Sequence, residues 1–136
     1  MSIPRSQHTA TLLQDGRILL VGRKGADLFN PNTETFRATT GTPTNRKGHA
    51  ALRLPDGSVL ITGGYVDRKA SKSAEVFDPL AEAFTSLPAT MLVPRANHAM
   101  APLPDGHVLV TGGFSGTSPH DEVDIFDSIQ QTFVAG

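Results

Sequence analysis

Short hydrophobic runs alternate with polar turns along the chain, and one such run occurs three times. The segment LPDGSVLITGG at 54–64 returns at 103–113 as LPDGHVLVTGG, and a weaker copy, LQDGRILLVGR, occupies 13–23. In each copy the apolar residues follow one another directly instead of recurring at helical spacing. A continuous apolar run of this length, bounded by turn residues, is typical of a strand buried on both faces. The pattern therefore predicts a repeated β unit.

The three copies, repeats 1 to 3, share anchor residues at constant spacing. Each begins at a histidine, continues to an Asp-Gly pair, and ends with two phenylalanines seven positions apart. The anchors are His8, His49 and His98, then Gly16, Gly57 and Gly106, then the pairs Phe29/Phe36, Phe77/Phe84 and Phe126/Phe133. The anchors keep their order while the segments between them vary in length, which is the behaviour of a structural repeat.

Each repeat is expected to form four short antiparallel strands, A to D. In repeat 2, strand A follows His49, a tight Pro-Asp-Gly turn leads to strand B at 59–62, strand C covers 74–79, and strand D begins near Phe84. Aspartate and glycine favour such turns because aspartate bonds the nearby backbone and glycine accepts a left-handed conformation. A sheet with two apolar faces must stack on others like it. The predicted units span about 5–40, 46–88 and 95–136.

The repeats resemble the kelch repeats of the galactose-oxidase-like propellers, in particular bacterial kelch-type repeats. The resemblance rests on Gly63-Gly64 and Gly112-Gly113 closing strand B, and on the paired aromatics, which are phenylalanine here. It implies an all-β chain, a single segment over 1–136 made of three four-stranded blades, incomplete as a single chain. Repeat 1 departs from the pattern because Arg23 replaces the second glycine and its B–C loop is shorter. A distorted or terminal first blade is therefore expected.

Three blades do not close a propeller ring, which typically has four to eight. The last D strand is expected to be barely begun after Phe133. An open arc would expose an apolar face at each end, and such faces usually mark an interface. Three arrangements follow: part of a larger propeller, a homodimer completing a six-bladed ring, or a lone arc.

The composition narrows the classes of partner. Twelve basic and 13 acidic side chains nearly cancel, so no nucleic-acid partner is expected. Cysteine is absent, which excludes thiolate metal sites. The longest strand-like apolar run, 18–21, is too short to span a bilayer, and no secretory signal is visible, so no membrane partner and a cytoplasmic location by default are expected.

The long, variable connections between strands B and C and between repeats would gather at one end of the sheets, where binding residues tend to lie. These segments are 23–26, 37–48, 65–74, 85–97 and 114–122. Arg5, Arg46 and Arg95 each precede an anchor histidine by three residues there. They are candidate ligand-binding residues, and the resemblance to kelch adaptors implies a grip on acidic peptides. The alternative is that each arginine braces its own loop or pairs with an acid.

Other chemical candidates are weaker. The three anchor histidines would lie too far apart around an axis to share one metal ion, so an interblade hydrogen bond is the simpler account. The Asp-Gly aspartates are assigned to turns. The cluster of His120, Asp121, Glu122 and Asp124 faces the basic Arg68, Lys69 and Lys72. The two groups form either a binding pair or two solvated loops, and solvated loops are favoured. No metal or other cofactor is expected. A copper radical oxidase site needs a cysteine-linked tyrosine, and the chain has only Tyr65 and no cysteine.

Two classes of function remain. The first is a non-catalytic kelch-repeat binding or scaffold module that presents its B–C and D–A loops to a protein or acidic ligand. The second is a fragment or lobe of a larger oxidase-like or glycosidase-like propeller enzyme whose active site lies outside this chain.

Overall fold

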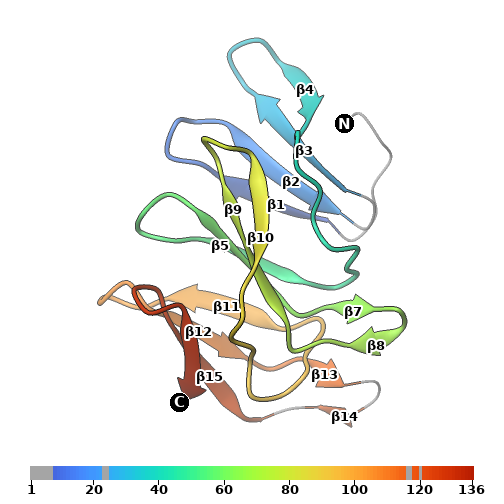
Figure 1. The fold of residues 1–136 in the computed structure, drawn as a ribbon, viewed down its shortest axis with the longest axis vertical. Coiled ribbons are helices and arrows are strands. Elements are labelled where there is room, and N and C mark those ends of the chain that lie inside the picture. The colour runs from blue at the N-terminus through green and yellow to red at the C-terminus, as the bar shows by residue number, and fades with distance from the viewer. Residues whose placement is uncertain (1–7, 23–24, 116–117, 120) are drawn as a thin grey trace.

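The computed structural model describes residues 8–22, 25–115, 118–119 and 121–136, and this part of the chain is all-β. It contains three antiparallel four-stranded sheets and two short hairpins, with no helix in these ranges (Figure 1). No helix able to span a membrane is therefore found in the described part. The all-β expectation is confirmed, and no sheet closes on itself.

Each sheet is built from one repeat, and the strands follow the chain order expected for strands A to D. Sheet 1 comprises β1 (Thr9–Leu12), β2 (Ile18–Gly22), β3 (Gly25–Asn30) and β4 (Thr35–Ala38). Sheet 2 comprises β5 (Ala50–Arg53), β6 (Val59–Thr62), β9 (Ala74–Asp78) and β10 (Ala83–Ser86). Sheet 3 comprises β11 (Ala99–Pro102), β12 (Val108–Thr111), β15 (Val123–Asp127) and β16 (Thr132–Ala135). The hairpins are β7 (Tyr65–Val66) with β8 (Lys69–Ala70) and β13 (Phe114–Ser115) with β14 (Ser118–Pro119).

The Asp-Gly turns form as predicted between the first two strands of every sheet. The Asp56 carboxylate accepts a hydrogen bond from the Ser58 backbone N–H at 2.9 Å, and Asp15 and Asp105 make the same contact two residues on. Gly57 has a φ of 92°, in the left-handed region that glycine adopts without a steric cost. These local bonds stabilise the tight turn that connects strand A to strand B.

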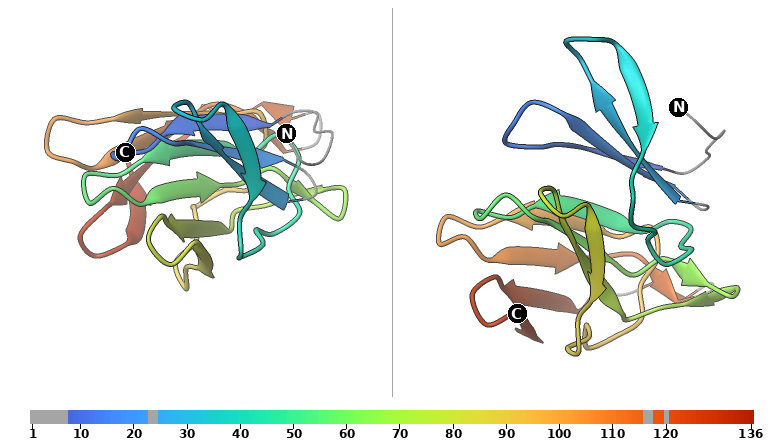
Figure 2. Two further views of the ribbon diagram at one scale, coloured as in Figure 1. Left: turned by 90° about the horizontal axis from the view of Figure 1, so that it is seen from above. Right: turned by 45° about the horizontal axis from the view of Figure 1, so that its top comes forward.

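The three sheets stack one after another, with their first strands nearest each other. Strand β1 packs beside β5, and β5 packs beside β11 (Figures 1 and 2). One cluster of buried side chains lies between sheets 1 and 2 and includes Leu19, Leu28 and Phe77. A second lies between sheets 2 and 3 and includes Leu60 and Phe126. Sheet 2 therefore has a neighbour on both faces.

Strand B of repeat 2 is buried on both faces, as predicted. In β6, Val59 and Ile61 belong to the cluster shared with sheet 1, whereas Leu60 belongs to the cluster shared with sheet 3. In β12 only Val108 and Val110 are buried, because no sheet formed by the described residues covers the other face of sheet 3. The prediction of two buried faces is therefore wrong for this copy.

The phenylalanine pairs are mostly core, with one exception. Ring centroids lie 4.7 Å apart in Phe77/Phe84 and 4.9 Å apart in Phe126/Phe133. Phe36, however, is 42% exposed, because sheet 1 carries its pair on the face turned away from sheet 2. The last D strand is also longer than expected: β16 has four residues, as do β4 and β10.

Candidate functional site

The variable loops gather at one end of the sheets, where they pair with each other. Lys47, before sheet 2, forms an antiparallel bridge with Tyr65 of β7. Ala96, before sheet 3, forms the corresponding bridge with Phe114 of β13, and Ser71 bridges to Arg95. Strands β8 and β13 are also neighbours. At the loop end, backbone pairings thus join repeat 2 to repeat 3.

Arg95 lies at the centre of a buried set of hydrogen bonds and an ion pair in repeat 3, which we call an arginine clip. Its side chain is 0% exposed, and its guanidinium donates to the Asp124 carboxylate at 3.0 Å and to the carbonyls of Gly112 and Glu122, each at 2.8 Å. Asp124 in turn accepts the backbone N–H of Leu92 at 2.9 Å. The ion pair therefore joins the end of strand B, the start of strand C and the preceding loop.

Arg46 makes the same clip in repeat 2 with poorer contacts. It is 2% exposed and donates to the Gly63 and Ser73 carbonyls at 2.9 and 3.3 Å. Its nearest approach to the Glu75 carboxylate is 3.5 Å, and its Nε is buried with no hydrogen-bond partner. Burial lowers the pKa of this guanidinium, and the Glu75 charge acts in the opposite direction.

The predicted arginine ring therefore does not lie open at the loop end. Arg46 and Arg95 are both inside the protein, where their donors hold neighbouring strands of the same repeat. These are the contacts that the bracing alternative describes. Arg5 lies outside the described residues. Ligand binding by these arginines would need the clips to open, and it stays a prediction.

The sequence contains a further sign of these clips, which the spacing of the arginines and histidines alone does not reveal. An acid stands two residues before the first phenylalanine of every repeat, namely Asp27, Glu75 or Asp124. All three carboxylates are buried. The prediction of a solvated loop is therefore wrong for Asp124, whereas Arg68, Lys69 and Lys72 are exposed as expected.

The anchor histidines form hydrogen bonds between neighbouring repeats. His98 Nε2 lies 2.7 Å from the Thr62 hydroxyl of sheet 2, and His49 Nε2 lies 2.9 Å from the Thr9 hydroxyl of sheet 1. Burial lowers the pKa of each imidazole to about 4, assisted by Arg95 beside His98 and by Arg46 beside His49. Both rings are therefore neutral at pH 7. Within the described ranges no three metal-ligating side chains come together.

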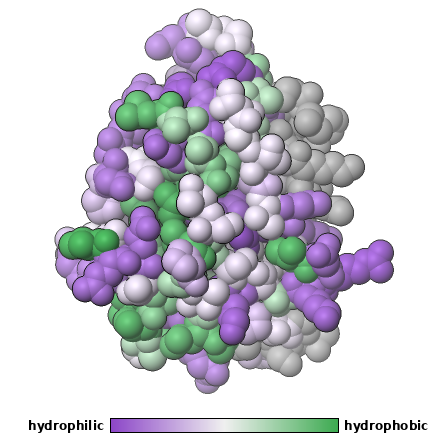
Figure 3. All heavy atoms as spheres, in the orientation of Figure 1, coloured by the Kyte–Doolittle hydropathy of each residue, from purple (hydrophilic) through white to green (hydrophobic). Residues whose placement is uncertain are grey.

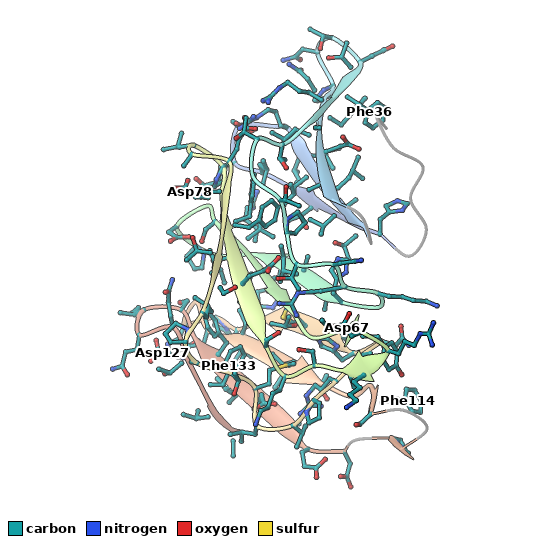
Figure 4. All side chains as sticks on the ribbon, turned by 45° about the vertical axis from the view of Figure 1, so that its right-hand side comes forward. Phe36, Asp67, Asp78, Phe114, Asp127 and Phe133 are labelled. Carbon is teal, nitrogen blue, oxygen red and sulfur yellow. The ribbon has the colours of Figure 1, made fainter. Side chains whose placement is uncertain are left out.

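An open hollow of about 500 Å³ lies at the loop end of repeat 2, lined by Asn45, Lys47, Tyr65, Asp67 and Arg68. The Lys47–Tyr65 bridge holds its two sides together, with backbone bonds of 2.7 and 3.2 Å. Asp67 and Arg68 form the two-residue turn of the β7–β8 hairpin, with φ values of 51° and 69°. Figure 4 shows this turn on the same side of the molecule as Phe114 of the next hairpin.

This hollow was not predicted residue by residue, although its members lie in the expected variable segments. Lys47 and Arg68 are exposed and unrepeated, so the comparison of repeats gave no sign of them. Comparison of the sequence with family models and with curated proteins finds no match in either set.

Proposed function

We propose that the chain is a segment of a kelch-type β-propeller, each sheet being one blade, and that it acts as a non-catalytic binding or scaffold module. The stacking of sheets through their first strands supports the propeller arrangement. The gathering of the B–C and D–A loops at one end supports a binding surface there, because rigid sheets commonly carry binding loops of this kind.

The ligand that the hollow of repeat 2 favours is an acidic peptide segment. Two exposed cations, Lys47 and Arg68, line it against a single acid, Asp67, and Asn45 adds an amide. A guanidinium binds carboxylates through paired hydrogen bonds, and an ammonium adds charge attraction. The observation that carries the proposal is the Lys47–Tyr65 bridge, which joins two variable loops around this cationic hollow.

Binding of a fluorescein-labelled glutamate-rich peptide, followed by fluorescence anisotropy, tests the proposal. We expect binding that weakens as salt rises, because the attraction is between exposed charges. Lys47→Ala and Arg68→Gly should each weaken binding roughly two- to fivefold, the range for exposed ion pairs. Glycine is chosen at position 68 because it tolerates the left-handed φ of 69° and keeps the turn.

Lys69→Ala is the matched control, because Lys69 is an exposed cation on the same hairpin but does not line the hollow. Its affinity for the peptide should equal that of the parent. The proposal would be contradicted if Lys47→Ala, Arg68→Gly and Lys69→Ala all bound the peptide as tightly as the parent. It would also be contradicted if the parent bound a lysine-rich peptide equally well.

A further inference from the structure

The interface between sheets 2 and 3 shows which residues on one face of a sheet contact the next sheet, and we call this interface the template. Across sheet 2, Leu52, Leu60, Val76 and Thr85 lie opposite one another in one row. Leu60 is 0% exposed because sheet 3 covers this face with Val108, Val110 and Phe126, among others. The row is apolar from strand A to strand C.

The uncovered face of sheet 3 repeats that row. Ala101, Leu109, Ile125 and Val134 lie opposite one another at the same strand positions. Leu109 and Ile125 are half-buried, and Val134 is 53% exposed. Hydrophobic residues reach the surface along the lower edge of the molecule in Figure 3, where sheet 3 lies in Figure 1. Sheet 3 thus has the surface that sheet 2 uses to receive a neighbour.

The residues that make the polar contacts in the template also have equivalents on this face of sheet 3. In the template, the Gly64 N–H donates to the Arg95 carbonyl at 2.8 Å, and a side chain at Gly63 would collide with Arg95 and with the His98 ring. On sheet 3 the position of Gly63 is taken by Gly112, where an added Cβ would meet no atom of the described residues within 4 Å.

The histidine contact of the template has the same kind of counterpart. Thr62 bonds His98, and Thr111, at the same position of sheet 3, is half-buried on the uncovered face. A threonine hydroxyl, a pair of glycines and an apolar row are therefore already arranged to receive an incoming repeat.

Sheet 1 offers the complementary face. Ile18 and Phe29 lie opposite each other on its side away from sheet 2, and Phe36 lies opposite Phe29. These positions match Val108, Phe126 and Phe133, the residues with which sheet 3 enters sheet 2. Phe133 is 8% exposed in that interface, whereas the matching Phe36 is 42% exposed.

The start of sheet 1 matches the template as well. His8 precedes β1 as His98 precedes β11, and it is exposed. An incoming sheet 1 would therefore bring a histidine to the position that faces Thr111, as His98 faces Thr62.

We propose that the uncovered face of sheet 3 binds the face of sheet 1 that carries Ile18, Phe29 and Phe36 in a second copy of this chain, head to tail. The complementarity of the two end faces, each a copy of one side of an interface already present in the molecule, identifies the occupant. Because each copy carries both faces, two copies can cover all four of them in a closed pair. This inference goes beyond the peptide site, which lies in the loops of repeat 2.

The mass in solution, measured by light scattering during gel filtration at tens of micromolar, tests the proposal. The parent is expected at twice the 14.4 kDa chain mass. Val134→Glu, on the face of sheet 3, and Phe36→Glu, on the face of sheet 1, should each give a monomer with the circular dichroism of the parent. Leu80→Glu is the matched control, because Leu80 is 96% exposed at a hairpin tip away from both faces, and it should remain a dimer.

Mixing the two monomeric variants separates head-to-tail pairing from pairing of like faces. The Val134→Glu chain keeps its sheet 1 face and the Phe36→Glu chain keeps its sheet 3 face, so the mixture should form a one-to-one dimer. A monomeric parent, an open series of larger species, a dimer that survives Val134→Glu, or a mixture that stays monomeric would each overturn the proposal. Peptide binding by the Val134→Glu monomer tests the loop site independently.

Discussion

Strand B of repeats 2 and 3 has almost the same sequence but a different environment. Val59–Thr62 is fully buried, whereas only alternate residues of Val108–Thr111 are. The difference is the number of neighbours, because sheet 2 lies between two sheets and sheet 3 has one. The apolar composition of each strand would allow sheets to pack on both of its faces. The position of the sheet in the stack then determines how much of that apolar surface is buried.

The arginine clips differ in the opposite direction, because the repeat with fewer neighbouring sheets has the shorter ion pair. The clip of Arg95 in repeat 3 has a bonded carboxylate at 3.0 Å, while Arg46 in repeat 2 approaches its carboxylate only to 3.5 Å. The less covered repeat thus has the better ion pair. The two repeats can be compared by breaking each of these features in turn.

The largest effect is expected from the arginine clips. Arg95→Ala leaves Asp124 buried without its cation, which should lower the free energy of unfolding by about 3–5 kcal/mol. Arg46→Ala should cost less, because its contact with Glu75 is longer and its Nε already lacks a partner. Urea unfolding followed by circular dichroism measures both.

Arg53→Ala is the control for loss of an arginine as such. Arg53 is exposed and its guanidinium donates a hydrogen bond to the Leu12 carbonyl at 3.1 Å, so its removal should change stability by less than about 1 kcal/mol. Similar losses for Arg95→Ala and Arg53→Ala would contradict the assignment of Arg95 to a buried structural clip.

The next effect tests the strand environments directly. Leu60→Ala removes a side chain enclosed between two sheets and should cost about 2–5 kcal/mol. Leu109→Ala, the same change at the matching position of sheet 3, should cost about 1 kcal/mol, because that side chain is already partly in water. Both are measured in the Val134→Glu background, where the face of sheet 3 stays uncovered. If the two variants lost the same free energy of unfolding, a neighbouring sheet would not determine how much this leucine stabilises the fold.

The local structure was predictable because its causes are local. The Asp-Gly turns, the four strands of each repeat and the two buried faces of β6 follow from turn chemistry and from apolar runs that the repeats confirm. The burial of Leu109 was not predictable in this way. Its sequence context matches that of Leu60, and only the missing neighbour sheet distinguishes the two.

The loop end was only partly predictable for a different reason. The spacing placed Arg46 and Arg95 at the start of strand A, but it could not say whether their side chains point into the sheet or out to solvent. The recurring acid of strand C, Glu75 or Asp124, is the sign that would have favoured the inward direction. The hollow at Lys47 and Arg68 depends on pairing between two unrepeated loops, which no single repeat encodes.

The last effect concerns the histidine contacts between repeats and appears only as the pH is lowered. The pKa of His98 is about 4 in the folded protein against an ordinary 6.5, so between these values the unfolded chain binds more protons. The stability that the neutral ring contributes is complete above pH 6.5 and declines as the pH falls toward 4. By pH 5 the loss should be about 2 kcal/mol for this residue, and His49 should add a similar loss. Urea unfolding at pH 7.5 and at pH 5 measures it, and His98→Gln should lower this difference by about half. A parent equally stable at both pH values would show that the imidazoles between the sheets are not held neutral by burial.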